Sequence, residues 1–100
     1  MKEYSIRIFS EAESDLDNIA DYLATLSEQA ALKYYDLIVE AIGTLKTMPE
    51  RCPLVKDTQL RLRGYRTLLV KNYIAFYIVK GETVEIRRIL YARRQYEGLL

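Results

Sequence analysis

The spacing of apolar residues changes once along this chain, near Pro53, and this change constrains the fold more than any other feature. Before it, apolar side chains recur every three or four residues, as they do on one face of a helix. After it, they alternate with polar ones over short runs, as they do in half-buried strands. A short alternating segment at residues 4–8 precedes the helical part. The expected order is therefore strand, helix, helix and three strands.

The helical part is predicted to form two helices joined by a tight link. The residues that share one apolar face are Ala12, Leu16, Ile19, Ala20, Leu23 and Leu26 in the first helix, and Ala31, Tyr34, Ile38, Ala41, Leu45 and Met48 in the second. Residues 10–13, Ser-Glu-Ala-Glu, predict a capping box, and Ser27 is the expected cap of the second helix. If Pro49 and Pro53 end the second helix, it has roughly six turns at 3.6 residues per turn. The short link predicts an antiparallel helical hairpin.

The second half is predicted to form strands at residues 65–70, 73–79 and 83–91, and the alternating Leu-Arg-Leu-Arg at 60–63 carries the strand pattern upstream. The run at 73–79 is apolar on both faces, so we expect it at the centre of the sheet. These elements predict one α+β domain over residues 1–100. In it, the N-terminal helical hairpin packs on a small, mainly antiparallel, twisted sheet.

Three local features of the second half carry further expectations. Asn72 and Gly81 are expected to take the positive φ that tight hairpin turns require. Arg87 and Arg88 interrupt the alternation of the last strand, which either a bulge or a polar concave face explains. A short turn or helix is expected near residues 95–99.

The two halves carry opposite charge. Residues 1–50 hold 4 Lys and Arg against 10 Asp and Glu, a net of −6, whereas residues 51–100 hold 11 against 4, a net of +7. Arginines and tyrosines interleave most densely at residues 61–66 and 87–96. Such a pattern is typical of a surface that contacts phosphates and bases, and also of a merely solvated strand face. Both interpretations remain open from charge alone.

The composition excludes several classes of enzyme. The chain has no histidine, so Ser-His-Asp and Cys-His catalysis and histidine-bearing zinc sites are excluded. The one cysteine, Cys52, rules out an intrachain disulfide and has no histidine base to make it a nucleophile. The glycines form no phosphate-binding or dinucleotide pattern, so neither a cofactor nor a metal is expected. The absence of an apolar leader or an 18-residue apolar run predicts a cytoplasmic protein with no membrane contact.

The C-terminal stretch resembles a known family. Residues 84–97 read VEIRRILYARRQYE. They match the pattern V-x-I-x-R-(I/V)-L-H-x-R-R-x-Y that ends many RelE/ParE toxins of bacterial type II toxin–antitoxin, or plasmid-stabilisation, systems. Tyr91 stands where the family often has histidine. The resemblance also extends over the first strand, the acidic helical hairpin and the proline-containing link.

The resemblance implies a toxin with one of two activities, because the fold serves both. RelE-like members cleave mRNA on the ribosome, whereas ParE-like members inhibit DNA gyrase without a known hydrolytic step. We take mRNA cleavage as the first interpretation, because the basic second half suits an RNA target, and gyrase inhibition as the alternative. A third possibility is a non-toxic family member. The expected partners are a cognate antitoxin, whose acidic segment folds over the toxin, and the ribosome with mRNA, or gyrase. DNA is contacted only through the antitoxin.

The expected catalytic residues follow from the family pattern and are Arg88, Tyr91, Arg93, Arg94 and Tyr96. Charge and position add Arg61, Arg63, Arg66 and Lys71 as contacts to RNA or another target. In metal-free cleavage, Tyr91 or Tyr96 would act as the base and the arginines would hold the phosphate. The alternative is that both tyrosines only pack against Leu99 and Leu100. Arg93 and Arg94 are expected to matter most, and Arg87, which lies outside the pattern, is expected to be silent.

Overall fold

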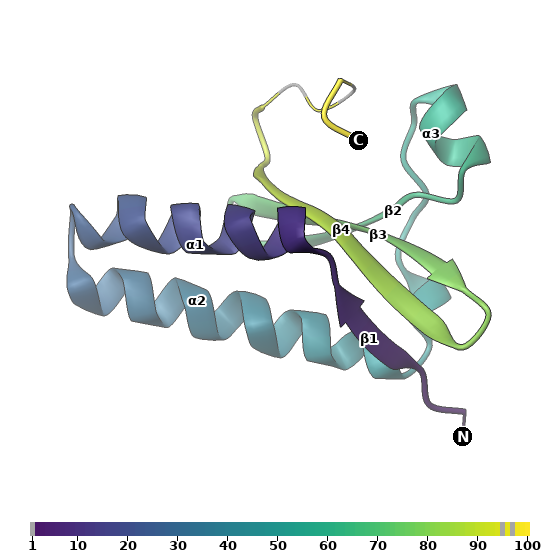
Figure 1. The fold of residues 1–100 in the computed structure, drawn as a ribbon, viewed down its shortest axis with the longest axis horizontal. Coiled ribbons are helices and arrows are strands. Elements are labelled where there is room, and N and C mark those ends of the chain that lie inside the picture. The colour runs from purple at the N-terminus through teal and green to yellow at the C-terminus, as the bar shows by residue number, and fades with distance from the viewer. Residues whose placement is uncertain (1, 95, 97) are drawn as a thin grey trace.

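The computed structural model describes residues 2–94, 96 and 98–100. The elements are β1 (Ser5–Ile8), α1 (Ser10–Ala24), α2 (Glu28–Gly43), η1 (Thr44–Lys46), η2 (Pro49–Arg51), α3 (Thr58–Leu62), β2 (Arg66–Val70), β3 (Tyr73–Lys80) and β4 (Thr83–Tyr91). The helices α1 and α2 run side by side as an antiparallel hairpin beside a twisted sheet (Figure 1). The predicted α+β plan is confirmed, with α3 as an added element.

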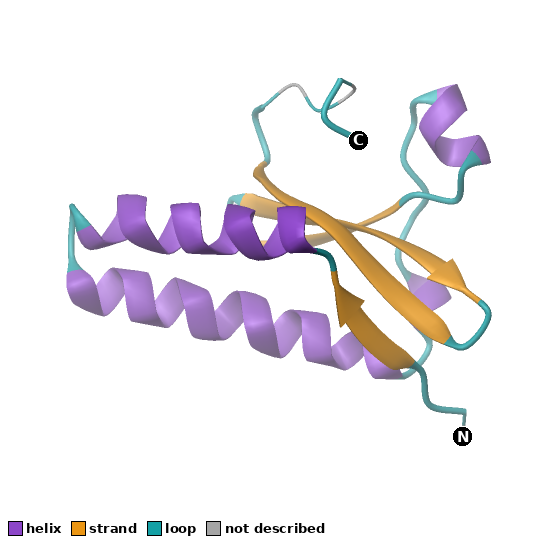
Figure 2. Cartoon of the chain, in the orientation of Figure 1, coloured by secondary structure: helices purple, strands orange, loops and turns teal. Residues whose placement is uncertain are grey.

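The sheet has the strand order β1-β4-β3-β2. β3 lies between β4 and β2, and it pairs antiparallel with both, which confirms its predicted central place. β1 pairs parallel to β4, with Ser5 opposite Thr83, so the first and last strands are neighbours (Figure 2). The Phe9 amide continues this pairing by donating to the Ile86 carbonyl at 2.9 Å. The start of α1 is therefore fixed at the end of the β1–β4 pair.

The helix caps follow the prediction at one helix and not at the other. Ser27 caps α2, because its hydroxyl accepts a hydrogen bond from the Ala30 amide at 3.2 Å. The capping box of α1 is wrong. The N-cap there is Phe9, in extended backbone, and the Ser10 hydroxyl donates to the adjacent Glu11 carboxylate at 3.0 Å. Backbone and Ser10 hydrogen bonds together lower the pKa of Glu11.

α2 is shorter than predicted. It ends at Gly43 after 16 residues, and one 3-10 turn, η1, carries the chain on to the buried Leu45. Met48, the last residue of the predicted stripe, is exposed and has a positive φ of 50°. The Arg51 guanidinium donates to the carbonyls of Thr44, Thr47 and Met48, and so it satisfies groups that a helix end leaves unpaired.

Residues 60–62 belong to a helix and Arg63 is its C-cap, so the prediction of a strand-like segment at 60–63 is wrong. Asp57 caps the short helix α3 by accepting from the Leu60 amide at 3.0 Å. The helix stops at Gly64, whose φ is 88°, and the Tyr65 amide returns to the Leu60 carbonyl. This is the glycine-terminated helix end that L-residues adopt only with strain. A single buried residue, Leu60, anchors the turn.

The break in the last strand is a β-bulge. Phe76 lies opposite Arg88 and Tyr77 lies opposite Ile86, so Arg87 is the extra residue.

The positive φ of the β2–β3 turn falls on Lys71, at 56°, and not on Asn72 as predicted, whereas Gly81 takes its expected positive φ in the β3–β4 turn.

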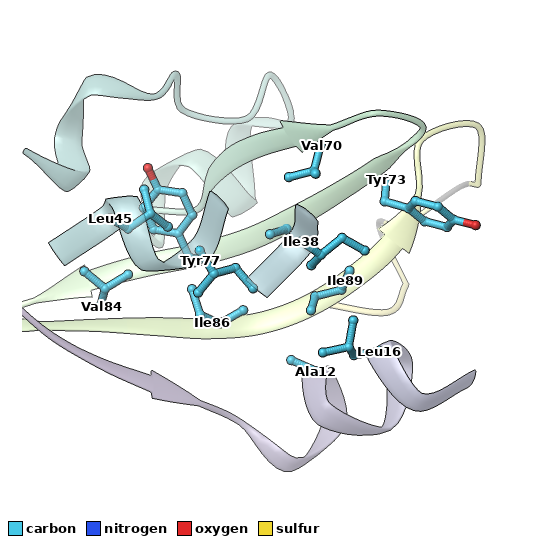
Figure 3. Packing of buried hydrophobic residues seen from close by; sticks show 12 residues of the cluster. Ala12, Leu16, Ile38, Leu45, Val70, Tyr73, Tyr77, Val84, Ile86 and Ile89 are labelled. Carbon is cyan, nitrogen blue, oxygen red and sulfur yellow. The ribbon is translucent and has the colours of Figure 1, made fainter. Parts of the chain in front are cut away.

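Two apolar clusters cover the two faces of the sheet. The larger lies between the sheet and the helical hairpin, where Ala12, Leu16 and Ile38 meet Tyr77, Ile86 and Ile89 (Figure 3). The second cluster lies on the other face and contains Val55, Leu60, Tyr65, Phe76, Ile78 and Leu90. Because both faces of the sheet are covered, β3 presents apolar side chains on both of its faces, as its sequence indicates.

We expect the phenol of Tyr77 to make the fold sensitive to alkali. Its side chain is fully buried, its hydroxyl donates to the Pro49 carbonyl, and burial raises its pKa well above the ordinary value. Above about pH 10 the unfolded chain loses this proton and the folded protein keeps it, so the free energy of unfolding falls as pH rises. Tyr77→Phe should flatten this fall.

The same substitution leaves the Pro49 carbonyl without its partner and should cost about 1–3 kcal/mol at pH 7. Denaturant unfolding at pH 7 and at several values above pH 10 measures both effects. Tyr22→Phe, at an exposed position, is the control. An unchanged alkaline slope in Tyr77→Phe contradicts the assignment.

Candidate functional site

The arginine after the bulge, Arg88, is held by a carboxylate of α1. Its Nε donates to Asp15 Oδ2 at 2.7 Å and its Nη2 to Oδ1 at 2.9 Å, a bidentate ion pair. The Ile89 amide donates to the same Asp15 Oδ2 at 3.0 Å, and Arg88 Nη1 donates to the Leu99 carbonyl at 3.0 Å. The hydrogen bonds that Arg88 donates to Asp15 raise the pKa of Arg88. The charge of this predicted catalytic residue is thus compensated within the fold.

Tyr96 lies in the tail, residues 92–100. Its ring centroid is 4.7 Å from that of Phe76, and Tyr96, Leu99 and Leu100 all pack against the second cluster. Arg63 Nη1 donates to the Leu100 carbonyl at 3.3 Å and helps to hold the tail. A turn at Gly98–Leu99 matches part of the predicted C-terminal turn, whereas residues 95 and 97 lie outside the described residues. The packing alternative fits Tyr96.

The other predicted residues near the C-terminus gather at one end of the sheet. The Ala92 amide donates to the Asn72 carbonyl at 2.8 Å, which sets Arg93 and Arg94 beside the β2–β3 turn that contains Lys71. Tyr91, Arg93, Arg94 and Lys71 are all exposed. The structure therefore brings together two sets that the sequence suggested separately, the catalytic candidates and one target contact.

This end of the sheet borders a groove of about 620 Å³ between α1 and the strands β3 and β4. We call it the tyrosine groove, and it is lined by Asp15, Asn18, Ile19, Tyr22, Leu23, Asn72, Tyr73, Ile89, Leu90, Tyr91 and Arg94. Tyr73 makes edge contacts with Tyr34 and Tyr91, at centroid distances of 6.3 and 5.9 Å. Burial, followed by the neighbouring tyrosines, raises the pKa of Tyr73, so its hydroxyl stays protonated.

The three arginines predicted from the 61–66 cluster differ in their contacts. Arg66 is half-buried, and its guanidinium donates to the carbonyls of Cys52 and Glu50 and lies 3.9 Å from the Glu50 carboxylate. Arg61 and Arg63 are exposed at the end of α3. Arg66 therefore holds the proline-containing link against β2, whereas Arg61 and Arg63 are exposed and Arg63 also contacts the tail.

Sequence reasoning missed several residues of this region. Asn18, Tyr22 and Asn72 line the groove, and Asp15 fixes Arg88, but none of them belongs to the family pattern. The one available signal was that Asp15, Ile19 and Tyr22 share a helix face with the apolar stripe. The guanidinium of Arg87, which was expected to be silent, lies 4.5 Å from the Phe9 ring and 3.1 Å from the Glu85 carboxylate, so its substitution also removes packing contacts. These contacts make it a poor silent control.

The described residues offer no site for a metal, since no group of three or more Cys, Asp or Glu side chains among them is arranged to hold one. Within the same residues, no helix is long and apolar enough to cross a membrane. What the region does offer is a set of aromatic, amide and cationic groups around a partly apolar groove. Such groups bind a partner surface.

Comparison with known proteins identifies the family. A family model described as "ParE toxin of type II toxin-antitoxin system, parDE" matches residues 6–96. The chain belongs to the ParE toxin family. The toxin is similar to a solved structure of the chromosomal ParDE toxin–antitoxin system from P. aeruginosa, with 27% identity over 93% of this chain and 100% of that one and a TM-score of 0.78.

It is also similar to a chain of the RelBE2 toxin–antitoxin complex from Mycobacterium tuberculosis. There the identity is 25% over 91% of this chain and 93% of that one, with a TM-score of 0.57. No curated protein matches the chain. The RelE/ParE resemblance and its fold are confirmed, and the protein is the toxin of a type II toxin–antitoxin system with a cognate antitoxin as partner.

We expect Asp15→Ala to be far more costly than other changes on the surface of α1. It leaves the half-buried Arg88 charge and the Ile89 amide without their partner, at a cost of about 3 kcal/mol in the free energy of unfolding. Asp17→Ala, on the same helix and exposed, should change it by less than about 0.5 kcal/mol. Denaturant unfolding compares the two. Equal losses would show that the ion pair does not anchor α1.

Proposed function

We propose that this ParE-family toxin inhibits DNA gyrase by binding it and does not cleave mRNA. The match to the ParE branch supports this, since ParE-like members inhibit gyrase. From the charge distribution alone, mRNA cleavage is preferred to gyrase inhibition, and this proposal reverses that order. The main observation in its support is that two residues expected to act in RNA cleavage make contacts within the fold. Arg88 is paired with Asp15, and Tyr96 packs against Phe76.

Cleavage of RNA by these residues would need a phenolate base beside uncompensated arginines. The ring of Tyr96 packs against Phe76, and the nearby Arg88 is paired with a carboxylate. Tyr91 lines the groove beside Arg94, and burial raises the pKa of the adjoining Tyr73, so Tyr73 itself is not a phenolate base. This arrangement supports binding better than proton transfer.

The tyrosine groove suits a protein segment. Its inner wall is aliphatic, with Ile19, Leu23 and Ile89, and accommodates an apolar side chain. Tyrosine and arginine, here Tyr22 and Arg94, are the residue types that contribute most at protein interfaces. With Arg93 and Lys71 near the rim, the preferred segment is acidic and carries one apolar anchor.

The positive charge near the rim of the tyrosine groove also explains how an antitoxin would neutralise the toxin. An acidic, partly disordered antitoxin segment gains contacts along a basic surface as it folds onto it, and it then excludes the target. We propose that the antitoxin covers the end of the sheet that contains Arg93 and Arg94.

Two experiments separate gyrase inhibition from mRNA cleavage. Purified toxin should block supercoiling by gyrase, and added antitoxin should restore it. After induction, mapped mRNA ends should show no new cuts within translated codons, while the DNA-damage response rises. Tyr91→Phe and Tyr96→Phe should stay toxic, because each keeps its ring and loses only the hydroxyl. Codon-associated cuts that vanish in either phenylalanine variant would establish the nuclease instead.

We expect Arg93→Ala/Arg94→Ala to reduce toxicity at least tenfold, since one lost charge-assisted contact is worth about 1.5–3 kcal/mol. Both side chains are exposed, so the melting temperature should not change. Lysine at both positions should restore only part of the activity, because it lacks the planar fork of arginine.

Lys46→Ala/Lys56→Ala removes the same charge from exposed positions elsewhere and is the control. Growth arrest at equal expression measures toxicity. Full toxicity of the arginine double variant would move the target surface away from this end of the sheet.

A further inference from the structure

α2 carries a second apolar face that none of the described residues covers. Leu32, Tyr35 and Val39 are 67%, 40% and 41% exposed and follow one another at spacings of three and four residues. We call these three residues the α2 stripe. The helix packs inward through other residues, Ala31, Ile38 and Ile42, so the stripe is additional to its core contacts.

The position of α2 leaves this face accessible. In Figure 1 α2 runs along one margin of the molecule, with α1 on its other side. None of the residues of the α2 stripe lines the tyrosine groove. By contrast, the solvent-facing positions through the middle of α1, such as Ser14, Asp17 and Asp21, are polar. Three-four spacing of apolar residues is the pattern through which one helix packs on another.

The charged residues beside the α2 stripe are complementary to themselves in one orientation only. Lys33, Asp36 and Glu40 lie on one flank of it at 100° per residue. If two copies of α2 pair antiparallel, Lys33 of one faces Glu40 of the other. In a parallel pair this flank would lie against the opposite flank of the partner helix, so Lys33 of one copy would not meet Glu40 of the other. No ion pair found among the described residues uses any of the three.

We propose that two copies of this toxin pair through the α2 stripe, antiparallel about a two-fold axis near Asp36 and Leu37. Such an interface is isologous, because the same patch serves both copies. Leu32, Tyr35 and Val39 of each copy pack on those of the other, and two Lys33–Glu40 pairs flank them. The stripe suits this partner better than an acidic antitoxin segment, because Glu28, Asp36 and Glu40 outnumber Lys33 on α2 around it.

The dimer is weak and reversible. One helix pair with three apolar side chains from each copy buries less than the roughly 1,200 Å² at the lower end of stable interfaces. We therefore expect a dissociation constant on the order of tens of micromolar, and both tyrosine grooves stay open in the pair.

Sedimentation velocity of the purified toxin, over a concentration series, tests the pairing. Wild type should shift from monomer to dimer, and Leu32→Glu should weaken the association at least tenfold. The control is Leu26→Glu, since Leu26 is 69% exposed in the link between the helices and off the stripe. It should behave as wild type. Circular dichroism confirms that all variants are folded.

Charge variants test the orientation. Lys33→Glu should weaken the dimer, Lys33→Glu/Glu40→Lys should restore it, and Asp36→Asn should tighten it, because Asp36 meets its own copy near the axis. A wild-type toxin that stays monomeric to about 1 mM overturns the proposal. So does failure of the double charge swap to restore pairing. Loss of antitoxin binding by Leu32→Glu in a monomeric toxin would assign the stripe to the antitoxin and equally overturn it.

Discussion

The carboxylate of Asp15 holds the helical hairpin, the last strand and the tail in a single arrangement. Its two oxygens accept three hydrogen bonds, two from the Arg88 guanidinium and one from the Ile89 amide. Arg88 in turn holds the Leu99 carbonyl. The pair joins α1 to β4 across 73 residues of sequence. On one side of it lies the tyrosine groove and on the other the packed tail, so the shape of both depends on this contact.

The bulge at Arg87 makes this arrangement possible. An extra residue in β4 changes the register between Phe76 and Tyr77, and beyond it Arg88 reaches α1 while Arg87 lies on Phe9. Both arginines lie on the face of the sheet that carries the second cluster, where they line one small pocket with Tyr65 and Leu99. The sequence marks them as an interruption of the strand, but only the register of the partner strand decides which way each side chain goes.

The predictions that succeeded rest on patterns repeated over many residues. The helical hairpin, the strand at 83–91 and the central place of β3 each follow from long stretches of consistent spacing. The predictions that failed rest on four or five residues. Residues 60–63 fit both alternation and one helical turn, and Asp57 and Gly64, which decide for the helix, lie outside that window. The capping box failed because the chain runs straight from β1 into α1.

The candidate site shows the same division. Composition located the arginine-rich end of the chain, and Tyr91, Arg93 and Arg94 do lie together beside Lys71. Whether an arginine is free to contact a partner depends on its contacts with residues that are distant in sequence. Arg66 and Arg88 look like their neighbours in the sequence, yet each is engaged by a partner more than ten residues away. The groove itself depends on α1 and β4 meeting, which no local pattern encodes.

The parallel pairing of β1 with β4 also bears on how the toxin is made. Among the described strands, β1 pairs with β4 alone, the first strand with the last in chain order, so contacts of long sequence separation complete the sheet. Until residues 83–91 have emerged, Ile6 and Ile8 lack the strand beside them and Asp15 lacks Arg88. Until then the sheet of the nascent chain stays incomplete. The end of the sheet that contains Arg93 and Arg94 therefore forms only after the last strand has left the ribosome.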